Sequence, residues 1–288
     1  MHIGRIVPVL LAGVAAAIGS AASAQVNPEG LEIRGAPIPG GIDFQPAATG
    51  LAADLQWLDG FLLVLITVIT IFVLALLVYC IVMFNQRKHP KPATFTHNTP
   101  IEVTWTIVPI AILFLIGGFS LPVLFDQQEI PEADVTVKVT GYQWYWGYEY
   151  PDHDFSFDSF MLGEAELADH GYGPDEFLLA TDTAMVVPTG QIVVVQITAA
   201  DVIHSWTIPA FGVKQDAVPG RVAQAWFEVD EGKEGIYFGQ CSELCGKDHA
   251  YMPITVMAVT AEEYETWLGQ AQEEYAGRPQ TVTVAAAE

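Results

Sequence analysis

Residues 60–86 read GFLLVLITVITIFVLALLVYCIVMFNQ and carry no charged side chain over 27 consecutive positions. A second run, residues 103–125, is free of charge over 23 positions. A helix that crosses a bilayer needs about 20 such residues. Pro109 and Pro122 lie in the second run, where neighbouring helices can satisfy the backbone groups that a proline frees. The sequence therefore predicts a transmembrane helical hairpin over residues 55–125.

The charges that flank this hairpin predict its orientation. The connecting loop, residues 87–102, holds three basic residues, whereas residues 25–59 hold only Arg34. Because cytoplasmic loops are enriched in Lys and Arg, we expect the loop in the cytoplasm and both flanks outside. Residues 25–54 then form an extracytoplasmic N-terminal segment.

The N-terminus has the pattern of a secretory signal. Arg5 precedes an apolar stretch over residues 6–18, and Ala22-Ser-Ala24 supplies the small residues typical of a cleavage site. A signal peptide over residues 1–24 is predicted, the alternative being a third, retained membrane helix. The signal and the hairpin agree on one location, a bacterial inner membrane with the soluble domain in the periplasm.

Most of the acidity lies in the second half of the chain. Residues 126–288 hold 28 acidic and 6 basic side chains, whereas residues 1–125 hold 6 and 5. Such a domain repels nucleic acid and attracts a basic partner, at a rate that falls as salt rises. A solvated surface that keeps the domain soluble is the alternative reading of any single carboxylate.

The pattern after residue 126 is that of short strands. Val135, Val137 and Val139 alternate with polar residues, as in a half-buried strand. Further strands are predicted at residues 192–197, 221–229 and 254–259, with Gly/Pro turns between them. The acidic stretch 152–176 is interpreted as an inserted loop.

These elements predict the fold class α + β, in which the hairpin is followed by an extracytoplasmic β-sandwich or barrel over residues 126–276. A helix over residues 261–276 closes the domain, and Thr260 with Glu263 fits a capping box at its start. Residues 277–288 are expected to form a flexible tail.

One loop carries the clearest chemical signal, CSELCGKDHAYM over residues 241–252. Cys245, His249 and Met252 offer a thiolate, an imidazole and a thioether, which together suit copper. A mononuclear blue-copper site adds one distant histidine on a β-sandwich, and His204 after the predicted strand 192–197 is the best candidate.

Cys241 is one ligand more than a single blue-copper ion requires. Two thiolates can bridge two metal ions, each with one histidine, which spreads the charge of one electron over both. Two alternatives stay open: a disulfide between Cys241 and Cys245, and structural zinc held by two Cys and two His. Haem attachment through Cys-x-x-Cys-His is excluded, since the chain lacks that motif.

A second cluster, GYQWYWGYEY over residues 141–150, is rich in aromatic side chains. Packing within a strand explains most of them. At least one could instead be exposed, as a point where a partner docks and an electron enters.

At these motifs the chain resembles subunit 2 of the haem–copper cytochrome c oxidases. The resemblance covers nearly the whole predicted mature chain and rests on EVTW at 102–105, QWYW at 143–146, DVIHSW at 201–206, KQDAVPGR at 214–221 and the loop 241–252. It implies a cupredoxin fold and a CuA centre that takes electrons from cytochrome c. It also implies passage of these electrons to haem in subunit 1, for reduction of oxygen to water coupled to proton pumping. The implied partners are cytochrome c, subunits 1 and 3 and membrane lipid.

The resemblance also implies roles for individual residues. Trp144 is implied as the electron inlet and Glu102 as the entrance of a proton channel. The Glu243 side chain is implied as a ligand to magnesium or manganese at the contact with subunit 1. The implied copper ligands are His204, Cys241, Cys245, His249, Met252 and the backbone carbonyl of Glu243. The implied docking positions for cytochrome c are Glu149, Asp158, Asp182 and Asp201. Two other readings are weighed: a tethered copper carrier, and a structural subunit of a quinol oxidase, which the intact copper loop disfavours.

Overall fold

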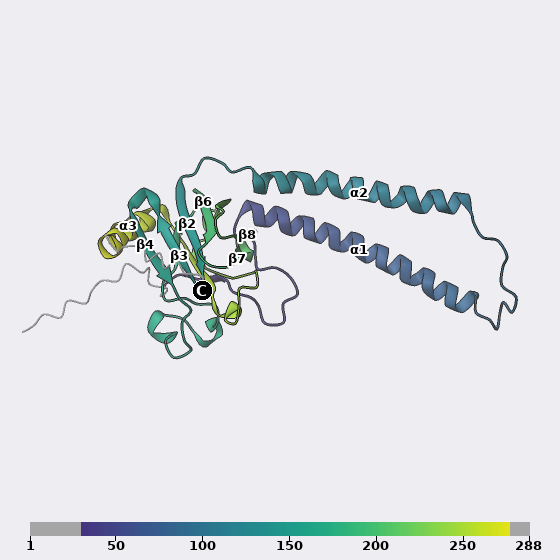
Figure 1. The fold of residues 1–288 in the computed structure, drawn as a ribbon, viewed down its shortest axis with the longest axis horizontal. Helices are drawn as coiled ribbons and strands as arrows, with labels where there is room; N and C mark the ends of the chain where they lie inside the picture. Colours follow the sequence, from purple (N-terminus) through teal and green to yellow (C-terminus); the bar gives the residue numbers. More distant parts are fainter. Residues whose placement is uncertain (1–29, 277–288) are drawn as a thin grey trace, which may run out of the picture.

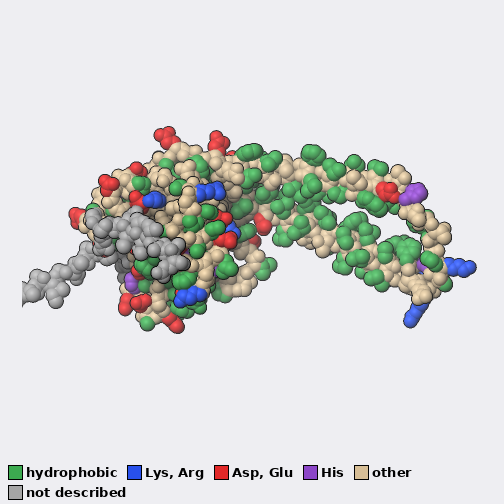
Figure 2. All heavy atoms as spheres, viewed as in Figure 1, with side chains coloured by type: hydrophobic (Ala, Val, Ile, Leu, Met, Phe, Trp, Pro, Cys, Tyr) green, Lys and Arg blue, Asp and Glu red, His purple; other side chains and the backbone are tan. Residues whose placement is uncertain are grey.

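The computed structural model describes residues 30–276, so the predicted signal peptide and the predicted tail lie outside the described residues. Two long helices, α1 (Gly50–Met83) and α2 (Thr99–Gln128), project side by side from a β-domain (Figure 1). Both are long and apolar enough to cross a membrane. Hydrophobic side chains cover their length, and basic side chains gather at the tip of the hairpin (Figure 2). This arrangement matches the predicted hairpin and its basic loop.

Polar side chains begin both long helices. The Thr49 side chain accepts a hydrogen bond from the backbone N–H of Ala52, and the Asn98 side chain accepts one from Ile101. These caps satisfy backbone donors that the first helical turn leaves without a partner. Pro109 and Pro122 lie inside α2, as the sequence indicated.

The β-domain is built from two sheets and a two-stranded ribbon. The four-stranded sheet has the order β1-β10-β11-β5, the five-stranded sheet has the order β4-β3-β2-β6-β9, and β7 pairs with β8. The bounds of the first sheet are β1 Ile33–Gly35, β10 Gly235–Gln240, β11 Pro253–Val259 and β5 Met185–Pro188. Those of the second are β4 Phe155–Ser159, β3 Tyr145–Tyr150, β2 Val135–Tyr142, β6 Ile192–Ala199 and β9 Ala223–Glu228. The ribbon is β7 His204–Ile208 and β8 Val213–Ala217.

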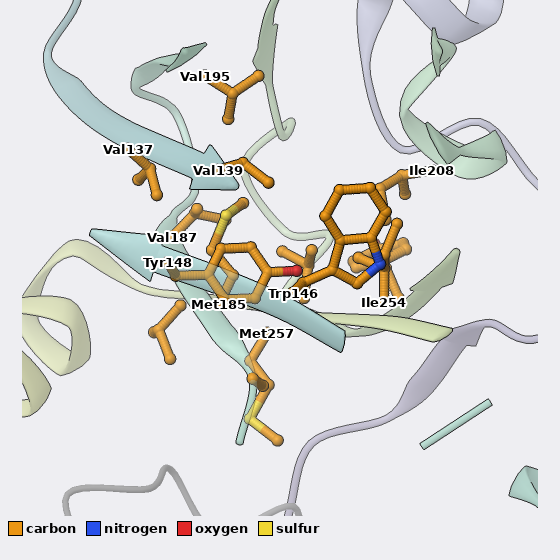
Figure 3. Packing of buried hydrophobic residues seen from close by; sticks show 14 of the residues in the cluster. Val137, Val139, Trp146, Tyr148, Met185, Val187, Val195, Ile208, Ile254 and Met257 are labelled. Atoms are coloured by element: carbon orange, nitrogen blue, oxygen red, sulfur yellow. The ribbon is translucent and has the colours of Figure 1, made fainter. Parts of the chain in front are cut away.

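The core lies between the two sheets. Side chains of β2 and β3 meet those of β5 and β11 there (Figure 3). Trp146, Tyr148 and Tyr150 alternate inward along β3 and are at most 1% exposed, so packing within a strand explains three of the six aromatic side chains of the cluster. Strands are confirmed at the four predicted positions as β2, β6, β9 and β11, and β9 is shorter than the predicted strand 221–229.

The expectation for residues 152–176 is wrong in part. Phe155–Ser159 form β4, which pairs antiparallel with β3. Phe155 and Phe157 point into the core while Ser156 and Asp158 face outward, so an alternating strand lies within an acidic segment. The N-terminal segment also joins the domain, because β1 pairs with β10.

The last helix, α3 (Ala261–Tyr275), begins with the predicted capping box. The Thr260 side chain accepts from the backbone of Glu263, and the Glu263 carboxylate accepts from the backbone of Thr260. Trp267 and Ala271 are buried on the helix face that covers β4 and β5.

The hairpin is tied to the domain at several points. The Thr49 hydroxyl donates to the carbonyl of Phe211, and the Trp226 indole donates to the carbonyl of Asp126 near the end of α2. Gly212 has φ +69°, and a Cβ there would lie 2.8 Å from the Cα of Ala52. Glycine therefore permits the close approach of α1 to the domain.

Candidate metal centre

Two segments far apart in sequence bring sulfur and imidazole groups together. His204 opens β7, while Cys241 and Cys245 lie in the loop between β10 and β11. The ligand atoms of these three buried residues all lie within 4.8 Å of one another. The same loop supplies His249 and Met252, so the structure assembles the five side chains that the sequence singled out.

The sulfur atoms lie at the middle of this cluster. The Sγ atoms of Cys241 and Cys245 are 3.7 Å apart, and both thiols are free. Cys241 Sγ lies 3.8 Å from Nδ1 of His204. Cys245 Sγ lies 3.5 Å from Nδ1 of His249 and 3.4 Å from Sδ of Met252. Both histidines therefore turn the same ring nitrogen, Nδ1, toward a cysteine sulfur.

The backbone explains why the two segments meet. Gly239 lies in β10, two residues before Cys241, and a Cβ there would overlap the carbonyl oxygen of Thr207 in β7. The backbone N–H of Ser242 donates to the carbonyl of Ser205 at 3.0 Å. Close approach of β10 to β7 thus sets Cys241 beside the histidine that opens β7.

The two thiols have opposite tendencies to ionise. Burial alone would raise the pKa of Cys241, but hydrogen bonds to His204 and to backbone groups lower it to about 6. Burial and the charge of this neighbour raise the pKa of Cys245 to about 12. Burial lowers the pKa of His204, yet its hydrogen bonds to Cys241 and Asp201 outweigh that effect and raise it.

The donor set fits copper. Two thiolate sulfurs, two imidazoles and a thioether are soft or borderline ligands. The carbonyl oxygen of Glu243 lies 3.3 Å from Cys241 Sγ and adds a weak donor. A bound cation would offset the repulsion between the two thiolate charges that raises the pKa of Cys245. Metal binding displaces protons from its ligands in this way. Two sulfurs side by side, each facing a different histidine, suit a pair of ions better than one.

Trp144 lies directly against this loop. Its indole Nε1–H donates to the carbonyl oxygen of Cys245 at 3.1 Å, and the Gln143 amide donates to the same oxygen at 2.8 Å. The ring is partly buried, and the Lys247 ammonium lies 5.4 Å from its centroid. A Cβ at Gly246, where φ is +124°, would lie 2.9 Å from the indole. The sequence motif indicated Trp144 but gave no sign of its contact with the loop.

The carboxylates expected at the docking face fall into two groups. Asp201 lies next to the metal cluster, with one oxygen 2.9 Å from Nε2 of His204. Glu149 pairs with Lys138 at 2.7 Å. Glu149, Asp158 and Asp182 form the second group and line a cavity of about 400 Å³ over β3 and β4, together with Tyr142 and Tyr145. Burial, then the charge of Asp182, raises the pKa of Asp158.

Glu102 and Glu243 lie in different parts of the molecule. Glu102 is in the first turn of α2, at the tip of the hairpin away from the domain (Figure 1), and accepts a hydrogen bond from the backbone of Asn98. Glu243 is exposed in the loop that carries the two cysteines.

Sequence reasoning missed two neighbours of the cluster, Gly141 and Gln143. A Cβ on Gly141 would lie 2.9 Å from Cδ2 of His204. Gln143 joins both ligand segments through hydrogen bonds. Both precede Trp144 in a motif whose clearest feature is its aromatic side chains. The one signal in the sequence for these two neighbours is a glycine near the end of a strand, which often marks a close approach of another group.

Two sequence models of known families match the chain. The model described as the periplasmic domain of cytochrome C oxidase subunit II matches residues 135–259, and that of its transmembrane domain matches residues 37–123. The chain is 60% identical over 272 residues to cytochrome c oxidase subunit 2 of Cereibacter sphaeroides, covering 90% of this chain and 89% of the relative. It is 46% identical over 234 residues to a probable cytochrome c oxidase subunit 2 of Rickettsia bellii, covering 81% and 84%.

A solved structure is also similar. The crystal structure of the periplasmic domain of subunit II of cytochrome oxidase from Bradyrhizobium japonicum is 48% identical, covering 51% of this chain and 99% of that one, with a TM-score of 0.46.

Proposed function

The chain belongs to the cytochrome c oxidase subunit II family, and we propose that its loop 241–252 and His204 hold two copper ions as a CuA centre. As a member of this family it is the electron-accepting subunit of an oxidase of the inner membrane, with its β-domain in the periplasm. The observation that carries the proposal is the pair of free thiols 3.7 Å apart, each beside a different histidine.

The proposed ligands are His204, Cys241, Cys245, His249, Met252 and the carbonyl oxygen of Glu243. A copper pair held by these residues would supply a one-electron acceptor whose charge is shared between two ions. The β10–β7 approach and the Ser242–Ser205 hydrogen bond hold the loop that carries the two cysteine sulfurs beside His204. The nearly complete burial of the sulfurs keeps water away from them.

Trp144 is the proposed electron inlet. Its hydrogen bond to the Cys245 carbonyl joins a partly exposed aromatic ring to a residue that also supplies a bridging sulfur. The proposed donor is cytochrome c, whose basic face would meet Glu149, Asp158, Asp182 and Asp201. The excess of acidic residues after position 126 supports this choice, because opposite charge accelerates association.

Three further roles complete the proposal. The exposed Glu243 carboxylate would bind magnesium or manganese with ligands from subunit 1. Glu102, at the cytoplasmic end of α2, would admit protons to a channel in subunit 1, and its capping hydrogen bond fixes its position. The exposed apolar faces of α1 and α2 would pack against subunits 1 and 3 and lipid, and electrons would leave toward haem in subunit 1.

Electron paramagnetic resonance of the assembled oxidase tests the copper assignment. We expect hyperfine splitting from two equivalent copper nuclei, lost in Cys241→Ser and kept in the matched control Cys80→Ser, which changes a thiol in α1. A single-copper pattern in the unmutated protein, bound zinc, or a Cys241–Cys245 disulfide would each contradict the proposal.

Steady-state kinetics test the inlet. Trp144→Phe should lower kcat with cytochrome c while leaving the copper signal unchanged. Asp182→Asn removes a charge from the proposed docking face but keeps an oxygen for the backbone N–H of Phe160, and it should raise KM with little effect on kcat. Equal kcat in Trp144→Phe and the unmutated oxidase would refute the role of Trp144.

A further inference from the structure

The Asp201 carboxylate is engaged on both oxygens within its own chain. Oδ1 accepts from the backbone N–H of Val202 at 2.6 Å and lies 2.9 Å from Nε2 of His204. Oδ2 accepts from the backbone N–H of Gln143 at 2.7 Å. One carboxylate thus joins the loop before β7, the imidazole of His204 and the turn that carries Trp144.

The imidazole contact has a defined direction. Nδ1 of His204 faces the sulfur of Cys241, so it is the nitrogen that would bind metal. The proton of the neutral ring then resides on Nε2, which donates to Asp201. The His204 side chain is 0% exposed and that of Asp201 is 24% exposed, so little water competes with this bond.

We propose that Asp201 is a positioning residue of the copper centre, which fixes the orientation and tautomer of His204 and holds the Gln143–Trp144 turn against the ligand loops. This inference rests on the proposed function, since it assumes that His204 binds copper through Nδ1. It goes beyond attraction of cytochrome c, which requires only an exposed charge.

The hydrogen bonds of the turn reinforce this position from the other side. The Gln143 amide and the Trp144 indole both donate to the carbonyl of Cys245. The turn therefore spans the two ligand segments, bound to the His204 side through Asp201 and to the cysteine loop through this carbonyl. Loss of the carboxylate therefore removes the hydrogen bond to His204 and the one bond that ties the turn to the His204 side.

The test compares Asp201→Asn with Asp158→Asn in the assembled oxidase. The two substitutions make the same chemical change, but the Asp158 carboxylate lies over β3 and β4 and makes none of the contacts described for Asp201. We expect Asp201→Asn to bind copper about 10- to 100-fold less tightly in competition with a chelator, as for other residues that orient a metal-bound histidine. The electron paramagnetic resonance spectrum of its copper should also change. Asp158→Asn should keep both properties, and its effect on the reaction should be confined to KM for cytochrome c and the dependence of KM on salt.

Copper retention and a resonance spectrum like those of the unmutated oxidase, with a change in KM alone, would overturn the proposal and leave Asp201 as a docking charge. A second measurement needs no variant. The ¹⁵N nuclear magnetic resonance spectrum of the copper-free full chain in detergent should show a proton on Nε2 of His204. An Nε2 without a proton would also overturn the proposal. Absence of a two-copper signal from unmutated oxidase would instead refute the proposed function itself.

Discussion

A methyl group added at Gly141 should disturb the copper site by pushing against the side chain of the proposed ligand His204. Gly141 lies in β2, and a Cβ there would lie 2.9, 3.0 and 3.1 Å from Cδ2, Cγ and Cβ of His204. Carbon atoms in contact are ordinarily separated by about 3.5–4.0 Å, so the imidazole of Gly141→Ala must shift by about 0.5 Å. That shift exceeds the tolerance of about 0.2 Å for a metal–ligand distance.

The ring has little room to yield. His204 is 0% exposed, the Trp146 ring lies 5.9 Å from it between centroids, and Asp201 holds Nε2. Overpacking of this kind costs about 1–3 kcal/mol, whereas replacing glycine stabilises by about 0.4–1 kcal/mol through the unfolded chain. The net expectation is a loss of about 1–2 kcal/mol of folding free energy.

The assay combines copper content, resonance spectrum and thermal unfolding of the purified oxidase. Gly141→Ala should show a changed copper spectrum and a lower Tm. Gly269→Ala is the control, since Gly269 lies in α3 with no atom within 4 Å of its would-be Cβ. There alanine should stabilise by up to about 1 kcal/mol and leave copper unaffected. An unaltered spectrum and an unaltered Tm in Gly141→Ala would refute the steric argument.

Three further substitutions test individual contacts and charges elsewhere in the domain. Lys247→Met removes the cation above Trp144 and should lower KM for a basic cytochrome c about twofold at low salt, with the difference vanishing at high salt; a rise in KM would contradict this. Asp158→Asn should raise Tm at pH 7, because burial and Asp182 raise the folded pKa and ionisation therefore costs stability. This gain should shrink as pH falls through the raised pKa toward the ordinary value of 3.8, and a gain that grew on acidification would be inconsistent with the sign of the shift. Tyr150→Phe removes a buried hydroxyl that donates to the carbonyl of Val186 at 2.8 Å and accepts from its N–H at 3.1 Å; the expected cost is about 1–3 kcal/mol in denaturant unfolding, and a cost near zero would show that water replaces it.

Much of the fold could be predicted because its signals are local. Apolar runs of more than 20 residues without a charge are typical of membrane-spanning helices. The alternation of Val135, Val137 and Val139 with polar residues follows from the two-residue period of a strand. Strand β4 was hidden because Asp158 and its acidic neighbours suggested a loop, although Phe155 and Phe157 alternate. Pairing of β1 with β10 could not be read from the sequence, since three residues carry no period.

The metal ligands could be predicted by residue type, but their arrangement depends on contacts between distant segments. Spacing alone grouped Cys241, Cys245, His249 and Met252, and His204 was added because a distant histidine was required. Spacing could not distinguish a docking carboxylate from one that orients a ligand, because both are simply Asp in the sequence. Asp201 shows the difference: its three hydrogen bonds reach residues 143, 202 and 204, and only folding brings the first of these to the others. A carboxylate on an acidic face is therefore better assigned by counting the donors that already occupy its oxygens than by its charge.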